Sequence, residues 1–273
     1  MLAGIASVQF GAALAKSLFD ELGPGGTVFL RVLFAAVVLA AVWRPAVRGL
    51  SRSDWRLIAP FGLTLAAMNL AFYESLDRIP LGVAVTFEMV GPLGVAIAGS
   101  RRALDVAWVV LAAAGIVLLS GFGGADLDGL GVALALVAGG FWAAYILLSV
   151  RVGLRFAGGE GLALAMGVGA VLLVPVGVTD AGGDLLVPWI LAAGLAVAIL
   201  SSAIPYTLEM EALRRLPTRV FGVMMSIEPA IAALAGFIVL DEGLATRELV
   251  AILLVVAASA GAARNAQVPP RDA

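Results

Sequence analysis

The sequence contains no cysteine and no histidine. Without cysteine the chain forms no disulfides and performs no thiol chemistry, and without both residues it has no Cys/His zinc site. The missing histidine also removes the side chain that titrates most readily near neutral pH. Any side chain that carries a proton through this protein must therefore be a carboxylate or a tyrosine. We expect no cofactor and no bound metal.

Charge is also scarce. Only 13% of the 273 residues are charged, whereas 62% are hydrophobic and the mean hydropathy is +1.07. Soluble domains carry about 25% charged residues, so this composition indicates a protein that crosses a membrane many times. The net charge of -2 gives no reason to expect nucleic-acid binding.

Long apolar stretches recur along the whole chain. A membrane helix needs roughly 20 apolar residues. Ala13-Leu14-Ala15 resembles a signal-peptide cleavage site, but no basic segment precedes it, so we interpret the first stretch as a membrane helix. The sequence predicts an all-α integral membrane protein with ten transmembrane helices, at about 2–19, 25–43, 57–76, 80–100, 104–121, 129–149, 160–178, 188–209, 217–239 and 247–264.

The loops between these stretches alternate in charge. Arginines follow the second, fourth, sixth, eighth and tenth stretches, whereas aspartate or glutamate follows the first, fifth, seventh and ninth. Basic loops stay on the cytoplasmic side of a membrane. We therefore expect both termini to be cytoplasmic.

One segment of the chain occurs twice, 137 positions apart. Residues 74–99 and 211–236 share rare residue types in register. Each half would hold five helices, an odd number, so the two halves would cross the membrane in opposite directions. We predict two inverted five-helix repeats at 1–122 and 128–264, followed by a cytoplasmic tail at 265–273. The shared residues include Glu74 with Glu211, Arg78 with Arg215, Pro80 with Pro217, and Pro92 with Pro229.

Both copies place a glutamate inside the membrane beside a proline. Glu88 precedes Gly91 and Pro92, and Glu228 directly precedes Pro229. A carboxylate at this depth costs at least a few kcal/mol unless it is paired, protonated or hydrated. The functional interpretation is binding of a substrate ammonium group or of a proton. The alternative is a structural glutamate that is hydrogen-bonded between helices. We expect the two prolines and Gly91 to break their helices and act as hinges.

Two basic residues also lie within apolar stretches. Arg31 could hold a substrate carboxylate or pair with Glu88, and the structural and functional interpretations are equally good. For Lys16 we favour extension to the outer surface, with Asp20 as a partner one helical turn away.

Tyr145 and Tyr206 could line a polar path, whereas the alternative is the aromatic belt at the membrane surface. Tyr206 follows Pro205 and two serines, which favours the cavity. Among the charged residues at helix ends, the repeated glutamate–arginine pair is expected to be structural, whereas Glu209 is more ambiguous because it lies one turn further into the eighth stretch. Glu74 and Arg78 are spaced to form an ion pair. The loop carboxylates are expected to be solvated rather than catalytic; they are Asp126, Asp128, Asp180 and Asp184.

Ten helices in two inverted halves, with Glu-Pro in the ninth, resemble the EamA-type branch of the drug/metabolite transporter superfamily. Segments 7–19, 86–96, 141–153 and 205–236 are similar to its threonine/homoserine exporters. This resemblance implies an inner-membrane protein that exports small amino acids or related metabolites. It also implies alternating access and proton coupling, without enzymatic activity.

Other functions remain open at this point. The substrate could be another metabolite, a drug or a sugar derivative, and the direction could be import. A structural or enzymatic membrane protein is the alternative from a different class, and the lack of histidine, cysteine and a clustered polar motif disfavours an enzyme. The chain's small-residue faces suit either a monomer or a homodimer in the lipid bilayer.

Overall fold

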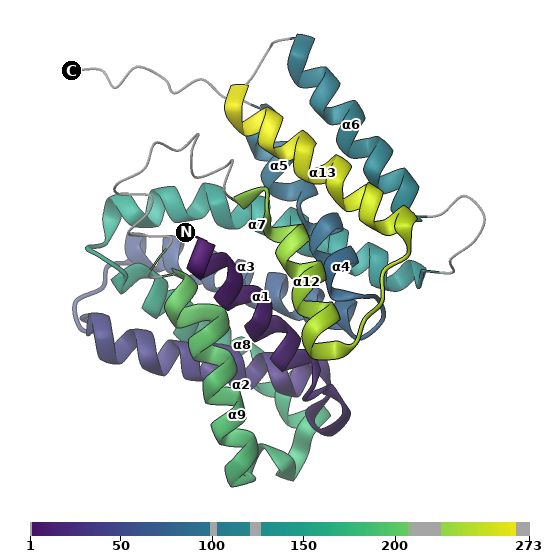
Figure 1. The fold of residues 1–273 in the computed structure, drawn as a ribbon. Coiled ribbons are helices and arrows are strands. Elements are labelled where there is room, and N and C mark those ends of the chain that lie inside the picture. The colour runs from purple at the N-terminus through teal and green to yellow at the C-terminus, as the bar shows by residue number, and fades with distance from the viewer. Residues whose placement is uncertain (1, 99–102, 121–126, 207, 209–224, 266–273) are drawn as a thin grey trace, which may run out of the picture.

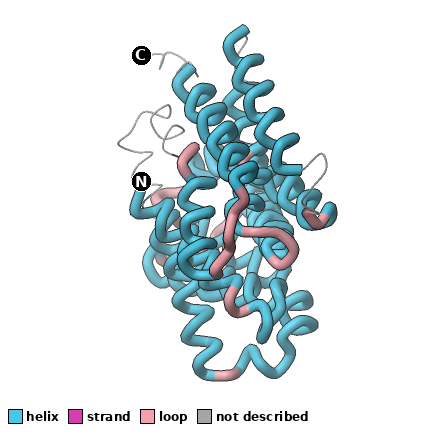
Figure 2. Tube along the Cα trace, turned by 45° about the vertical axis from the view of Figure 1, so that its right-hand side comes forward, coloured by secondary structure: helices cyan, strands magenta, loops and turns pink. Residues whose placement is uncertain are grey.

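The computed structural model describes residues 2–98, 103–120, 127–206, 208 and 225–265. Within these residues every regular element is a helix and none is a strand, as Figures 1 and 2 show, so the all-α prediction is confirmed. The first half contains α1 (Leu2–Lys16), α2 (Phe19–Trp43), α3 (Arg52–Leu76), α4 (Leu81–Glu88), α5 (Val90–Ala98) and α6 (Ala103–Ser120). The second half contains α7 (Gly129–Arg155), α8 (Glu160–Ala181), the 3-10 turn η1 (Gly182–Leu186), α9 (Pro188–Ala198), the π-helical turn η2 (Ile199–Ala203), α12 (Glu228–Leu240) and α13 (Thr246–Asn265).

Five of the described helical segments are long and apolar enough to cross a membrane: α2, α3, α7, α8 with η1, and Pro188–Tyr206. Three apolar segments are shorter, namely α1, Leu81–Val95 and α12. Each of the ten expected stretches overlaps a described helix, the ninth only from Glu228 because 217–224 lie outside the described residues. The count of ten spans and the inverted relation of the halves stay predictions.

Helix starts are fixed by local capping. At the start of α3, the Ser51 hydroxyl accepts the N–H of Asp54 and the Asp54 carboxylate accepts the N–H of Ser51, which satisfies two otherwise unpaired donors. Asp128 caps α7 by accepting the N–H of Gly131 at 2.7 Å. Asp180 accepts the N–H of Gly25 at 3.0 Å, where Gly23 (φ 66°) and Pro24 interrupt α2. These two aspartates, expected only to be solvated, therefore also accept backbone hydrogen bonds, at the start of α7 and at the interruption of α2.

Helices of the two halves pack against one another rather than forming separate bundles. α2 lies along α8, α3 lies along α7 and α8, and α1 contacts α12 and η2. α6 and α13 run side by side at one edge of the molecule (Figure 1). Glycines allow close approach: a Cβ on Gly177 would lie 2.5 Å from the Phe29 side chain. The centre of the molecule is thus lined by residues from both halves.

We call the region where Asp128, Ile79 and Glu242 lie together the acidic end, and the region around Arg155 the basic end. At the acidic end, Lys16 Nζ lies 2.7 Å from Glu242 Oε1 and donates a hydrogen bond to the Ile79 carbonyl. Glu242 Oε2 also accepts the Leu81 N–H at 2.9 Å. The expected Lys16–Asp20 pair is therefore wrong, because α1 ends at Lys16 and the two residues do not share a helix.

Three further ion pairs occur among the described residues, one of them between Arg78 and Asp77 at 3.8 Å. Arg78 pairs with Glu74 at 2.9 Å, so that prediction is confirmed. At the basic end, Arg155 Nε lies 2.7 Å from Asp54 Oδ1, which joins α7 of the second half to α3 of the first. Lys16–Glu242 and Arg155–Asp54 are thus cross-half ion pairs at opposite ends of the molecule.

Candidate functional site

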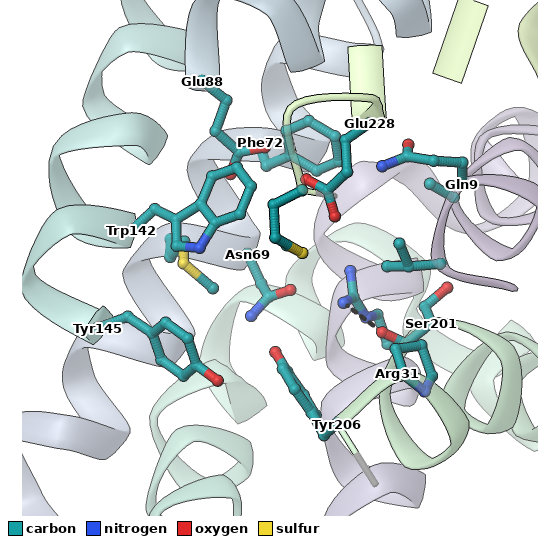
Figure 3. A pocket seen from close by; sticks show the side chains of 15 residues that line it. Gln9, Arg31, Asn69, Phe72, Glu88, Trp142, Tyr145, Ser201, Tyr206 and Glu228 are labelled. Atoms are coloured by element: carbon teal, nitrogen blue, oxygen red, sulfur yellow. Dashed lines mark hydrogen bonds between the residues drawn. The ribbon is translucent and has the colours of Figure 1, made fainter. Parts of the chain in front are cut away.

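A cavity of about 90 Å³ lies between the two halves (Figure 3). A single water needs roughly 10–15 Å³ measured in this way, so the space can hold a small solute. Its lining comes from α1, α2, α3, α4 and α7, from η2 and the turn after it, and from the start of α12. The lining residues are Val8, Gln9, Ala12, Arg31, Met68, Asn69, Phe72, Glu88, Trp142, Tyr145, Ser201, Pro205, Tyr206, Met225 and Glu228.

The structure brings the five predicted binding residues together around this one cavity. They are Arg31, Glu88, Tyr145, Tyr206 and Glu228. Each comes from a different helical segment, so the pattern within any single helix could not reveal that they meet. Tyr145 and Tyr206 have ring centroids 6.2 Å apart, and the two residues line the cavity instead of an outer belt.

Arg31 is the cation of the cavity. Its residue is 5% exposed, and neutral groups hold its guanidinium. Nε donates to the Ser202 hydroxyl at 3.2 Å, Nη1 to the Tyr73 hydroxyl at 3.3 Å and Nη2 to the Ser201 carbonyl at 3.0 Å. Among the described residues no ion pair joins Arg31 to Glu88 or to any other carboxylate. The positive charge is therefore positioned without being neutralised at contact distance.

The Ser201 carbonyl is available to Arg31 because of the local backbone. Pro205 has no N–H to donate to this carbonyl, which lies four residues earlier. The chain forms the π-helical turn η2 at this point, a local widening that often occurs at functional sites. Gly11 of α1 packs directly on the turn, since a Cβ there would collide with the Ser201 hydroxyl. The helix interruption thus leaves the Ser201 carbonyl free to accept a hydrogen bond from Arg31.

Glu88 is the last residue of α4, and the helix is interrupted at Met89 before α5 begins. Pro92 cannot donate an N–H to the Glu88 carbonyl, which explains the interruption. Gly91 and Gly139 allow the break to press against α7: a Cβ on Gly139 would lie 2.6 Å from the Glu88 carbonyl oxygen. The Glu88 residue is 8% exposed and lines the cavity, with no hydrogen bond or ion pair to another described residue.

Glu228 occupies the equivalent part of the second half. It is the first residue of α12, it is 3% exposed, and Pro229 follows it in the first helical turn. A carboxylate at this position interacts favourably with the positive end of the helix dipole. Figure 3 shows Glu88 and Glu228 entering the cavity from different sides. The hinge role assigned to Gly91, Pro92 and Pro229 remains a prediction.

Sequence reasoning missed two amides of the cavity, Gln9 and Asn69. Both are buried, at 5% and 3% exposed, and both line the cavity. Asn69 Nδ2 donates to the Leu65 carbonyl one turn earlier at 2.7 Å. The sequence could have identified each of them as a single amide in an otherwise apolar helix, because polar residues within membrane helices commonly face the interior of the protein.

Comparisons with known proteins agree with this architecture. Residues 129–264 match the EamA-like transporter family. The chain is 43% identical over 274 residues to the threonine/homoserine exporter RhtA of Salmonella typhimurium, covering 99% of this chain and 92% of that protein. It is 43% identical over 263 residues to the protein of the same name from Escherichia coli K12, covering 96% and 89%. A solved crystal structure shares the fold with a TM-score of 0.67 at 22% identity, covering 96% of this chain and 95% of that one.

The chain therefore belongs to the EamA-like transporter family, and the resemblance seen in the sequence is confirmed. It is a multi-pass membrane transporter and not an enzyme.

Proposed function

We propose that this protein is an inner-membrane secondary transporter that exports small amino acids such as threonine and homoserine. The observation that carries the proposal is the cavity itself, which holds a fixed cation and two carboxylates between the two halves. A zwitterion presents the matching charges. The relatives named for threonine and homoserine export support the same substrates.

A zwitterionic amino acid fits the positions of these groups. The planar guanidinium of Arg31 is suited to a carboxylate, because its N–H groups can form paired hydrogen bonds. Tyr73, Ser201 and Ser202 already fix its orientation. The substrate ammonium would then lie toward Glu88, where it would compensate a buried carboxylate, and Glu228 is the second candidate position for the ammonium group.

Alternating access is the proposed transport cycle. Two inverted five-helix halves, with both termini in the cytoplasm, would place the acidic end outside and the basic end inside. The Lys16–Glu242 pair joins α1 to the segment after α12, and thus one half to the other, at the acidic end. Release of substrate to the outside would require this pair to part.

Proton coupling is proposed to use Glu88. The chain has no histidine, and Glu88 is a cavity carboxylate without a fixed partner among the described residues. A proton arriving from outside would neutralise the carboxylate and weaken its hold on the substrate ammonium. Inward proton movement would then favour outward movement of the amino acid.

Flux measurements in liposomes containing the purified protein test these proposals. Labelled threonine or homoserine is placed inside, a pH gradient is imposed, and wild type is compared with Glu88→Gln. We expect the variant to lose gradient-driven flux by at least about tenfold, because the amide cannot carry the proton. Glu74→Gln is the matched control: Glu74 pairs with Arg78 outside the cavity, so its flux should stay near wild type.

Two results would count against the proposals, in different ways. Unchanged gradient-driven flux in Glu88→Gln would remove the coupling role of Glu88. No flux of either amino acid through folded wild-type protein would remove the substrate assignment.

A further inference from the structure

Together with the Ser201 hydroxyl, Gln9 is one of two described cavity residues that have a buried polar atom without a hydrogen-bond partner. It belongs to α1, is 5% exposed, and its Oε1 has no hydrogen-bond partner among the described residues. Nearby polar side chains do have partners: Ser7 Oγ donates to the Leu200 carbonyl at 2.7 Å, and Asn69 Nδ2 donates to the Leu65 carbonyl. A buried amide oxygen left unpaired is costly, so its position requires an explanation.

The packing of α1 prevents Gln9 from turning away. Gly11 faces η2 so closely that a Cβ would collide with the Ser201 hydroxyl and lie 2.9 Å from the Leu200 Cβ. Gly4 faces Leu208, since a Cβ on Gly4 would lie 3.5 Å from the Leu208 Cβ. The Ser7 hydrogen bond fixes the same face of the helix. α1 is therefore held against the second half with Gln9 directed at the cavity.

The neighbours of Gln9 suggest which part of a solute it would meet. Figure 3 shows its amide turned toward Glu228, on the opposite side of the cavity from Trp142 and Tyr145. Val8 and Ala12, also on α1, line the cavity with apolar groups. An amide beside short apolar side chains is suited to a bound amino acid whose small side chain has one polar group.

We propose that Gln9 binds the side-chain hydroxyl of the transported amino acid and thereby selects hydroxylated substrates over apolar ones of the same size. The inference rests on the proposed function and adds the residue that sets its specificity. A hydroxyl both donates and accepts, so it satisfies the amide whichever of its two ends faces the solute. A methyl group in the same place would leave the amide unpaired.

Selectivity of this kind needs a polar partner. An apolar pocket discriminates poorly between groups of similar size, whereas a site that hydrogen-bonds a hydroxyl rejects the analogue that lacks it. Threonine and valine are such a pair, and homoserine and norvaline are another. We expect wild type to prefer the hydroxylated member of each pair by about ten- to a hundredfold in kcat/KM.

The test measures kcat/KM for all four amino acids in liposomes with wild type, Gln9→Met and Asn69→Leu. Methionine keeps the length of glutamine and removes its hydrogen bonding. We expect Gln9→Met to bring both ratios close to one, chiefly through loss of threonine and homoserine transport. Asn69→Leu is the comparison variant, because Nδ2 of this cavity amide already donates to the Leu65 carbonyl; if Gln9 sets the selectivity, Asn69→Leu should affect both members of a pair alike and keep the ratios.

The outcomes separate the inference from the function on which it rests. Wild-type flux without any preference for the hydroxylated amino acids overturns the role of Gln9 while leaving amino-acid export intact. The role of Gln9 is also overturned if Gln9→Met keeps the wild-type kcat/KM ratios. It is overturned as well if folded Gln9→Met and Gln9→Leu lose transport of all four amino acids equally. Absence of amino-acid flux in wild type is failure of the proposed function itself, and the inference falls with it.

Discussion

Charges at the two ends of the molecule are paired, whereas charges in its centre are not joined to each other. Lys16 contacts Glu242 at 2.7 Å at one end, and Arg155 contacts Asp54 at 2.7 Å at the other. In the cavity, Arg31 is held by hydroxyls and a carbonyl. Each end has an ion pair between the halves, whereas in the centre Arg31 and Glu88 form no ion pair with each other.

This difference has a physical meaning. A buried charge is tolerated only when it is compensated, and at the ends the largely buried carboxylates of Glu242 and Asp54 are compensated by Lys16 and Arg155. In the centre the protein compensates its charges only in part, because Arg31 and Glu88 line the same cavity without a direct ion pair. A zwitterionic solute can supply the missing partners, a carboxylate for Arg31 and an ammonium group for Glu88. The ion pairs at the ends connect the two halves, and we propose that the centre is where a solute binds.

Cross-linking the acidic end should have the largest effect. Because the chain has no cysteine, the double variant Lys16→Cys/Glu242→Cys contains the only two thiols. We expect a short bifunctional thiol reagent to reduce flux in liposomes to background, since the acidic end could no longer open, and a reductant that cleaves the link to restore it. Each single cysteine variant treated with the same reagent is the control. Full transport by completely cross-linked protein would show that this end need not part.

Replacing the central cation should have the next largest effect. Arg31→Gln removes the charge but keeps hydrogen-bonding capacity, so we expect kcat/KM for threonine to fall about a hundredfold. Arg31→Lys keeps the charge without the planar fork and should lose less, about tenfold. Thermal unfolding in detergent checks that both variants fold. If folded Arg31→Gln transports like wild type, Arg31 has only a structural role.

The sequence predicted the centre better than the ends, for a physical reason. Glu88, Glu228 and Arg31 stand out because ionisable residues are rare and costly within apolar helices. The partner of Lys16 does not stand out, because Glu242 lies 226 positions away and only the packing of α12 against α1 and α4 brings it near. Gln9 escaped notice for a related reason, since its missing partner is a property of its surroundings and not of its own helix.

Breaking the basic end should have the smallest effect. Asp54→Asn removes the ion pair with Arg155, whose side chain is 55% exposed, while an asparagine can still accept the Ser51 N–H at the start of α3. Water already screens so exposed a charge, so we expect flux within about twofold of wild type and only a slight fall in thermal stability. Arg155→Gln leaves the Asp54 carboxylate, which is only 8% exposed, with its Ser51 hydrogen bonds but without its ion pair, so its fall in thermal stability should be the larger of the two. A loss as large as that of Arg31→Gln would instead mean that the basic-end pair takes part in transport, because a purely scaffolding contact at an exposed surface cannot account for it.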